Sequence, residues 1–321
     1  MAIDTAKSTT STVSQVLAKY YDKLFLERAE ANLVHKQLGQ RSTNIGGGQG
    51  GVGTGMVQWT RWSNLSTVSA GQGEGVPTTA VSLTATAVTA TLSQYDNAVS
   101  ISDILARASF GDITKSAMEI LAYNAGISID TVIRNAVAAS LTTQNATGVA
   151  AAAWTSIPAT GVLSISEIRK AVRTLKRNDA MTQSDGFFVA VVHPDTSYDL
   201  MGDTTTGGWI DANKYMNAEK LFNGEIGKMY GVRFLETSNG YVKGTGVTAS
   251  ASIYTTSVFG KEAFGISELQ QLKTFVKNFG SGGVADPTDK IATVGWKCMF
   301  GVAVLNSAFG ININHAVSST A

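Results

Sequence analysis

The chain has 321 residues, of which 44% are hydrophobic, which is enough for one large or two medium-sized domains. Only 15% of the residues are charged and the net charge is +1, whereas an average soluble domain is about 25% charged. This near-neutral balance gives no electrostatic argument for binding nucleic acid or a membrane surface. A surface so poor in charge is typical of proteins that bury much of it against partners.

The single cysteine, Cys298, excludes an intrachain disulfide and a cysteine-based zinc site. No apolar run reaches the roughly 18 residues of a membrane span, and the first residues lack the apolar segment of a signal peptide. These features predict a protein that is made and used in a cytoplasm, with no membrane partner.

Residues 13–38 are predicted to form a helix with an apolar stripe. Because this arm precedes any domain core, we expect the stripe to dock elsewhere, with a second copy of the chain as one candidate. The stripe consists of Val16, Leu17, Tyr20, Leu24 and Ala31.

Residues 45–55 contain seven glycines in eleven positions. A phosphate-binding loop of this kind needs a Gly-Lys-Ser/Thr run that opens a helix, and a dinucleotide fingerprint needs a strand before it and a helix after it. Here no lysine follows and the next segment reads as a strand. The pattern therefore favours a flexible hinge.

Residues 56–62 and 80–92 alternate apolar and polar side chains, which predicts two long strands joined by a glycine-rich tip at 69–77. The alternation of the second strand changes phase at Val88. This slip predicts either a bulge or a strand that leaves one sheet for another environment.

A two-stranded arm is marginal alone in water, and its open edges invite pairing. We therefore expect the hairpin to lie across a neighbouring copy of the chain. The candidate contact residues are Trp59 and Trp62, because aromatic side chains dominate interface energetics, together with Val81 and Leu83. Packing of the tryptophans within the hairpin's own docking site is an equally open alternative.

Residues 112–141 form the longest amphipathic pattern, with Asp112 as the expected N-cap. At 1.5 Å per residue this helix is about 45 Å long and needs partners along its whole length. Its weak point is Gly126, which costs about 1 kcal/mol relative to alanine. The apolar positions are Ile113, Ala117, Ile120, Leu121, Val132, Ile133, Ala136 and Val137.

Residues 163–266 are predicted to form an α/β domain, with a central apolar strand at 187–192. Its first helix begins with Ser164 and Glu167, spaced as a capping box. The basic face of this helix lacks interleaved aromatic residues for base stacking, which favours a solvated or subunit-facing surface over nucleic acid. The basic residues are Arg169, Lys170, Arg173, Lys176 and Arg177.

His193, Asp195, Asp199 and Asp203 fall close enough in sequence to be drawn as a metal site. The simpler interpretation is that Pro194 opens a short helix whose N-terminus favours the acidic residues. We therefore predict no metal, no cofactor and no catalytic residue, with a metal-dependent hydrolase around His193 as the alternative.

Residues 267–321 return to strand and are predicted to pair near the long helix. They would close the domain to which that helix belongs, so that the α/β domain is inserted within it.

Five segments resemble the major capsid proteins of the N4-like phage family, which share the HK97-like coat fold of tailed bacteriophages. The likeness runs from Val81 to the last strands. The segments are VSLTATAVTATLSQYDNAVSISDIL (81–105), EIRKAVRTLKRNDA (167–180), VVHPDTSYDLMGDT (191–204), VFGKEAFGI (258–266) and VADPTDKIATVGWK (284–297).

The resemblance implies an α+β, HK97-like fold with five parts. These are an N-terminal arm (1–41), an extended β-hairpin or E-loop (42–98), a discontinuous peripheral domain with the spine helix (99–162 and 267–321), and an inserted axial domain (163–266). It further implies a structural protein that is not an enzyme and has no cofactor.

The implied function is self-assembly into an icosahedral shell of pentamers and hexamers around double-stranded DNA, without sequence-specific contacts. The implied partners are separate scaffolding, portal and decoration proteins, and the location is the virion capsid, assembled in the cytoplasm of a bacterial host. A cargo-enclosing shell protein, like an encapsulin, remains the alternative.

Overall fold

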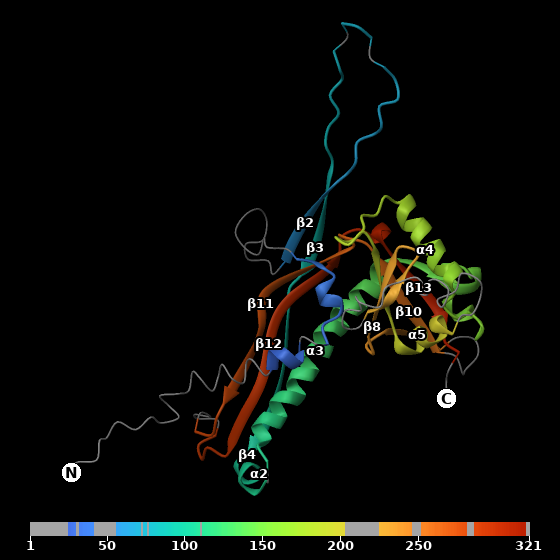
Figure 1. The fold of residues 1–321 in the computed structure, drawn as a ribbon. Coiled ribbons are helices and arrows are strands. Elements are labelled where there is room, and N and C mark those ends of the chain that lie inside the picture. Colours follow the sequence, from blue (N-terminus) through green and yellow to red (C-terminus); the bar gives the residue numbers. More distant parts are fainter. Residues whose placement is uncertain are drawn as a thin grey trace, which may run out of the picture.

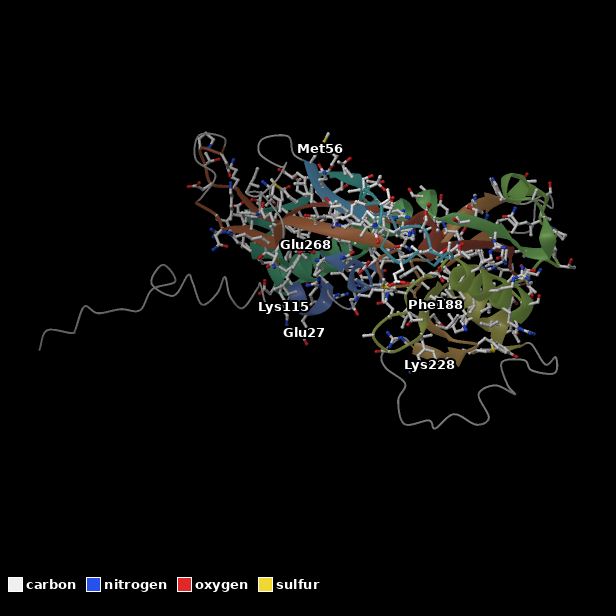
Figure 2. The ribbon with its side chains drawn as sticks, turned by 90° about the horizontal axis from the view of Figure 1, so that it is seen from above. Glu27, Met56, Lys115, Phe188, Lys228 and Glu268 are labelled. Atoms are coloured by element: carbon white, nitrogen blue, oxygen red, sulfur yellow. The ribbon has the colours of Figure 1, made fainter. Side chains whose placement is uncertain are left out.

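The computed structural model describes residues 25–29, 32–41, 56–71, 73–75, 77–109, 111–202, 225–245, 252–280 and 286–318. Within these residues the fold is mixed α+β, with a long helix, a two-stranded hairpin, a four-stranded sheet and a seven-stranded sheet. The hairpin projects far from the rest of the chain (Figure 1). Seen from above, Glu268 of the four-stranded sheet and Phe188 of the seven-stranded sheet lie in two neighbouring bodies (Figure 2).

The long helix is α3 (Ile113–Ser140), and its bounds confirm the prediction. The side chain of Asp112 caps it by accepting a hydrogen bond from the backbone N of Lys115 at 3.1 Å. The predicted stripe is wrong at Ile120, which is 66% exposed. The buried face of α3 combines large apolar residues, among them Leu121, Ile133 and Val137, with small residues that let neighbouring backbone approach. The small residues include Ala117, Ala122, Ala125 and Gly126.

The N-terminal segment docks on α3 of its own chain. Residues 25–29 are helical, and Phe25, Ala29 and Leu33 are buried in the same core as the long helix. The prediction that the stripe docks elsewhere is not tested, because all five of its residues lie outside the described residues. The predicted helix is wrong at its C-terminal end, because residues 32–38 are not α-helical. Residues 13–24 and 30–31, which carry the whole predicted stripe, lie outside the described residues, as does the glycine-rich run at 45–55.

The four-stranded sheet has the order β1-β11-β12-β4 and packs one face on α3. Alternate residues of β12, namely Val294, Trp296, Cys298 and Phe300, point into that core. Its elements are β1 (Gln40–Arg41), β4 (Ser93–Ser102), β11 (Phe264–Lys277) and β12 (Ile291–Val304), and it is flanked by η1 (His35–Gln37) and α2 (Asp103–Ala108).

The hairpin consists of β2 (Met56–Trp62) and β3 (Ala85–Thr91), which pair antiparallel. The first strand matches its prediction, and the second begins five residues later than predicted. The chain then runs through Leu92 directly into β4, which pairs with β12. The β2–β3 register continues through Val88 without a bulge, so the predicted position of the irregularity is wrong. The strand does leave one sheet for another, but the change occurs at Leu92.

The seven-stranded sheet has the order β5-β13-β10-β6-β8-β7, with β9 paired to β10. Its strands are β5 (Thr142–Asn145), β6 (Phe188–Val192), β7 (Glu225–Met229), β8 (Val232–Glu236), β9 (Tyr241–Thr245), β10 (Ser252–Phe259) and β13 (Gly310–Ala316). The other helices within the described ranges are α4 (Ile165–Arg177), α5 (Pro194–Met201), η2 (Ala146–Gly148), η3 (Ala151–Ser156) and η6 (Ser307–Phe309).

The strand β6 is central, as predicted, because both of its faces are covered. Val189 and Val191 join the core around α3, whereas Phe188, Ala190 and Val192 join the core beneath α4. Two apolar cores thus meet at one sheet.

The predicted pairing of the last strands is confirmed for β11 and β12 and wrong for β13. Every residue of β13 is buried, and the strand lies between β5 and β10 in the seven-stranded sheet. A strand buried on both faces needs a neighbour on each edge. The α/β body therefore includes strands from outside residues 163–266.

The predicted capping box is also wrong. The hydroxyl of Ser164 contacts that of Ser166 at 2.8 Å and makes no cap hydrogen bond. Glu167 accepts hydrogen bonds from Gln144 Nε2 and Lys170 Nζ, each at 2.7 Å.

The described helices include none that is long and apolar enough to cross a membrane.

Candidate assembly surfaces

The base of the hairpin is fixed on its own chain. Val57 and Ala90 are buried, and the ring of Trp59 lies against Gly265 of β11, where an added Cβ would stand 3.0 Å from Trp59 Cε2. The indole Nε1 of Trp59 is buried without a hydrogen-bond partner among the described residues. Trp59 therefore anchors the hairpin within the subunit.

The distal part of the hairpin is an exposed apolar surface. Trp62, Val81 and Leu83 are 63%, 71% and 65% exposed. Beyond the β2–β3 ladder, the described backbone joins the two arms through a hydrogen bond from Ser63 N to Thr84 O at 3.0 Å. An apolar surface that projects this far from its own body is typical of a surface that meets a partner.

Two further exposed residues of the same region, Leu65 and Val68, were not singled out from the sequence. They precede the glycine-rich tip and follow no strand alternation, so no periodic signal marked them. The charge of the hairpin is low throughout, since residues 56–92 contain a single cation, Arg61, and a single anion, Glu74.

A groove of about 650 Å³ lies between the hairpin base and the α/β body. Trp59 and Trp62 line one side of it, and Met181, Glu262 and Phe309 line the other. The sequence did not predict this groove, because its walls come from segments more than 100 residues apart.

Other apolar side chains are exposed on the body around α3. They lie on β11, on α2 and on the outward face of α3. These residues are Leu269, Phe275, Ile104, Leu105, Ile120 and Tyr123.

The candidate metal ligands serve local structure instead. His193 caps α5 by accepting a hydrogen bond from Asp195 N at 3.2 Å, and Asp195 Oδ2 accepts from the hydroxyl of Tyr254 at 2.9 Å. Asp199 accepts from the backbone N of Ser318 at 2.9 Å, and Asp203 lies outside the described residues. Within the described ranges no three His, Cys, Asp or Glu side chains are placed to hold a metal ion.

The lone cysteine is a core residue. Cys298 is buried against α3, and burial raises the pKa of its thiol to about 11. The thiol therefore stays protonated near neutral pH and is a poor nucleophile.

The basic face of α4 is exposed, as predicted. Arg169 lies over the ring of Tyr230 with 5.5 Å to its centroid, and Lys170 pairs with Glu167 at 2.7 Å. Arg173, Lys176 and Arg177 point to solvent.

A family model described as phage capsid protein matches residues 85–312, which is more than half of the chain. The chain belongs to this phage capsid protein family. It is therefore a structural, shell-forming major capsid protein, and its place is the virion capsid. No curated protein matches the chain in sequence.

Solved phage capsids have the same fold. The capsid subunit of cyanophage Pam1 is similar with a TM-score of 0.64 and 15% identity, over 88% of this chain and 89% of that chain. That of Ralstonia phage GP4 has a TM-score of 0.64 and 14% identity, over 88% of each chain. That of Helicobacter pylori bacteriophage KHP30 has a TM-score of 0.60 and 11% identity, over 83% and 86%. The predicted HK97-like fold is confirmed.

Proposed function

We propose that the chain builds an icosahedral shell of pentamers and hexamers that encloses a double-stranded DNA genome, as a member of the N4-like group of capsid proteins. The observation that carries the proposal is the exposed apolar hairpin, which projects from a body whose surface is poor in charge. Covering such a surface on another copy removes apolar area from water at roughly 25 cal/mol per Å². Self-association is the most direct way to cover it.

Within this shell, Trp62, Val81 and Leu83 of one subunit contact the next subunit. Trp59 instead fixes the base of the hairpin on its own subunit. Trp59 lies on Gly265 of its own chain and lines the groove beside Trp62. Trp59 thus holds the hairpin on its own subunit, and Trp62 binds the neighbouring subunit.

The division into arm (1–41), E-loop (42–98), peripheral domain (99–162 and 267–321) and axial domain (163–266) belongs to the same proposal, with β5 and β13 now assigned to the axial domain. The proposal also includes separate scaffolding, portal and decoration proteins, and DNA contacts without sequence specificity. It further includes assembly in the cytoplasm of a bacterial host and the absence of enzymatic activity.

A shell that encloses cargo protein, as an encapsulin does, is the second candidate. The net charge of +1 is equally compatible with either content. The nucleic-acid content of shells from infected or recombinant cells separates the two: packaged double-stranded DNA supports the virion, and a protein cargo supports the alternative.

Electron microscopy of the expressed protein tests the assembly role. We expect shells from the natural chain, and we expect the variant Trp62→Ala/Val81→Ala/Leu83→Ala to remain a folded subunit. Because a few buried anchors carry most of an interface's energy, the concentration needed for assembly should rise by roughly tenfold or more.

The matched control is Tyr198→Ala, which removes an exposed aromatic side chain from α5, away from the hairpin. Shells that form normally from the triple variant would refute the hairpin contact. A natural chain that remains a monomer under all assembly conditions would refute the shell itself.

A further inference from the structure

A buried carboxylate in the middle of α3 joins segments that are about 100 residues apart in sequence. Asp130 is 0% exposed and lies beside His35, whose side chain is 3% exposed. Its Oδ1 accepts a hydrogen bond from the backbone N of His35 at 2.8 Å, and its Oδ2 lies 2.8 Å from His35 Nδ1. Asp130 therefore holds the N-terminal segment on the long helix.

The same carboxylate also holds the turn that follows β8. Asn239 Nδ2 donates to Asp130 Oδ2 at 3.1 Å. This turn connects β8 to β9, both of which belong to the seven-stranded sheet. One oxygen atom is thus shared between the N-terminal segment and the α/β body.

Residues one turn further along α3 complete the contact. Arg134 Nη1 donates to Asn239 Oδ1 at 2.6 Å and to the carbonyl oxygen of Gly240 at 3.2 Å. The guanidinium also lies 5.6 Å from the ring centroid of Tyr241, over its face. Thr131 and Asn239 exchange side-chain hydrogen bonds at 3.2 and 3.3 Å. The turn therefore has its own attachment to α3 and depends on Asp130 only in part.

Because the Asp130 carboxylate is shared between the N-terminal segment and the turn, the loss of one partner has an energetic consequence for the other. A buried charge is tolerated when hydrogen bonds replace the water it has lost, and leaving such a charge without its partners is strongly destabilising. Among the described residues, Asp130 has donors from His35 and Asn239 alone. When the N-terminal segment moves away from α3 and takes His35 with it, the Asp130 carboxylate loses its hydrogen-bond partner on Oδ1 and one of its two partners on Oδ2.

We propose that Asp130 couples the N-terminal segment to the α/β body. The bound position of residues 32–41 stabilises the position of the turn at 237–241, and the turn stabilises the segment in return, because coupling between two sites is reciprocal. When the N-terminal segment is drawn away from α3, the turn loosens and the seven-stranded sheet is less firmly held against the helix. This inference concerns a single subunit and does not depend on the architecture of the shell.

A second contact of the same segment provides the control. Lys36 Nζ pairs with Glu268 Oε1 of β11 at 2.7 Å. This pair attaches the segment to the four-stranded sheet and does not touch Asp130 or Asn239. Its loss leaves the contacts of Asp130 with His35 and Asn239 in place, so it should affect the turn much less than the loss of the His35 side chain does.

Amide hydrogen exchange of the full-length soluble subunit tests the coupling. We expect Asn239→Ala to speed exchange within residues 32–41 by about tenfold, and His35→Gln to speed exchange within residues 237–241 by a similar factor. Lys36→Ala should speed exchange within residues 32–41 as well, and it should change exchange within residues 237–241 less than His35→Gln does.

A static structural role predicts a different result, in which each variant changes exchange only around its own position. Unchanged exchange at 32–41 in Asn239→Ala, or at 237–241 in His35→Gln, would overturn the proposal. If either variant fails to fold, Asn239→Ser and His35→Ala shorten the side chains so that they no longer reach Asp130, and the same two expectations decide the outcome.

Discussion

Gly126 shows how one residue can be weak in its own helix and still be needed by the fold. Glycine in the interior of a helix costs about 1 kcal/mol relative to alanine. An added Cβ at this position would stand 2.7 Å from the carbonyl oxygen of Ala29 and 3.1 Å from Asn32 Cβ. The N-terminal segment therefore rests directly on the backbone of α3.

We expect Gly126→Ala to destabilise the subunit by about 1–3 kcal/mol, because the clash with a backbone oxygen outweighs the gain in helix propensity. The measurement is the free energy of unfolding in denaturant. Gly111→Ala is the matched control, since an added Cβ there meets nothing within 4 Å. An unfolding free energy that rises in Gly126→Ala would contradict the close approach.

His315 makes the stability of the subunit depend on pH. Burial lowers the pKa of His315 to about 4, and its Nε2 lies 3.0 Å from the hydroxyl of Thr256. Because the unfolded residue titrates near pH 6.5, the unfolded state binds a proton that the folded state excludes between pH 6.5 and 4. The contribution of His315 to stability is therefore complete above pH 6.5 and falls as the pH drops towards 4.

This loss amounts to about 3 kcal/mol between pH 7 and pH 4. We expect His315→Gln to flatten that part of the profile when the unfolding free energy is measured at several pH values. His193→Gln serves as the control, because His193 is a partly exposed residue at the start of α5. Parallel profiles for the natural chain and His315→Gln would show that another group causes the slope.

At the scale of the elements, the end of α3 is completed by a strand from the far end of the chain. The last carbonyl groups of a helix have no partners within it. Asn312 of β13 donates through Nδ2 to Val137 O at 3.2 Å and to Ala138 O at 2.9 Å. Its Oδ1 accepts from the hydroxyl of Ser257 at 2.8 Å.

We expect Asn312→Ala to lower the free energy of unfolding by about 2 kcal/mol or more, because it leaves buried polar groups without partners. Asn135→Ala, at an exposed position of the same helix, should change it by less than about 0.5 kcal/mol. Thermal and denaturant unfolding measure both. Equal changes in the free energy of unfolding for the two substitutions would contradict the capping role of β13.

The hairpin shows what an element's sequence can and cannot reveal. The alternation of residues 56–62 predicted β2 with its observed bounds. Trp59 and Trp62 were indistinguishable as anchors, because both are large aromatic residues. Only the position of Gly265, 206 residues from Trp59, decides that the first packs inward while the second remains exposed.

At the scale of the whole molecule, strand partners are chosen by contacts that are distant in sequence. The sequence marks β13 as a strand, but both of its neighbours, β5 and β10, come from other parts of the chain. Both faces of β13 are buried because α3 and α4 cover them, and the positions of these helices are known only from the tertiary structure. The same holds for Asp130, which reads in the sequence as one polar residue of a helix.

The sequence by itself determined the long helix, the central strand, the hairpin and a surface poor in charge, because periodicity and composition are properties of neighbouring residues. It also carried the resemblance to phage capsid proteins. The tertiary structure alone decided which sheet takes β5 and β13, that the N-terminal segment lies on α3, and that His35 and Asn239 share one carboxylate. These outcomes depend on burial and hydrogen bonding between segments about 100 or more residues apart, and no local pattern records them.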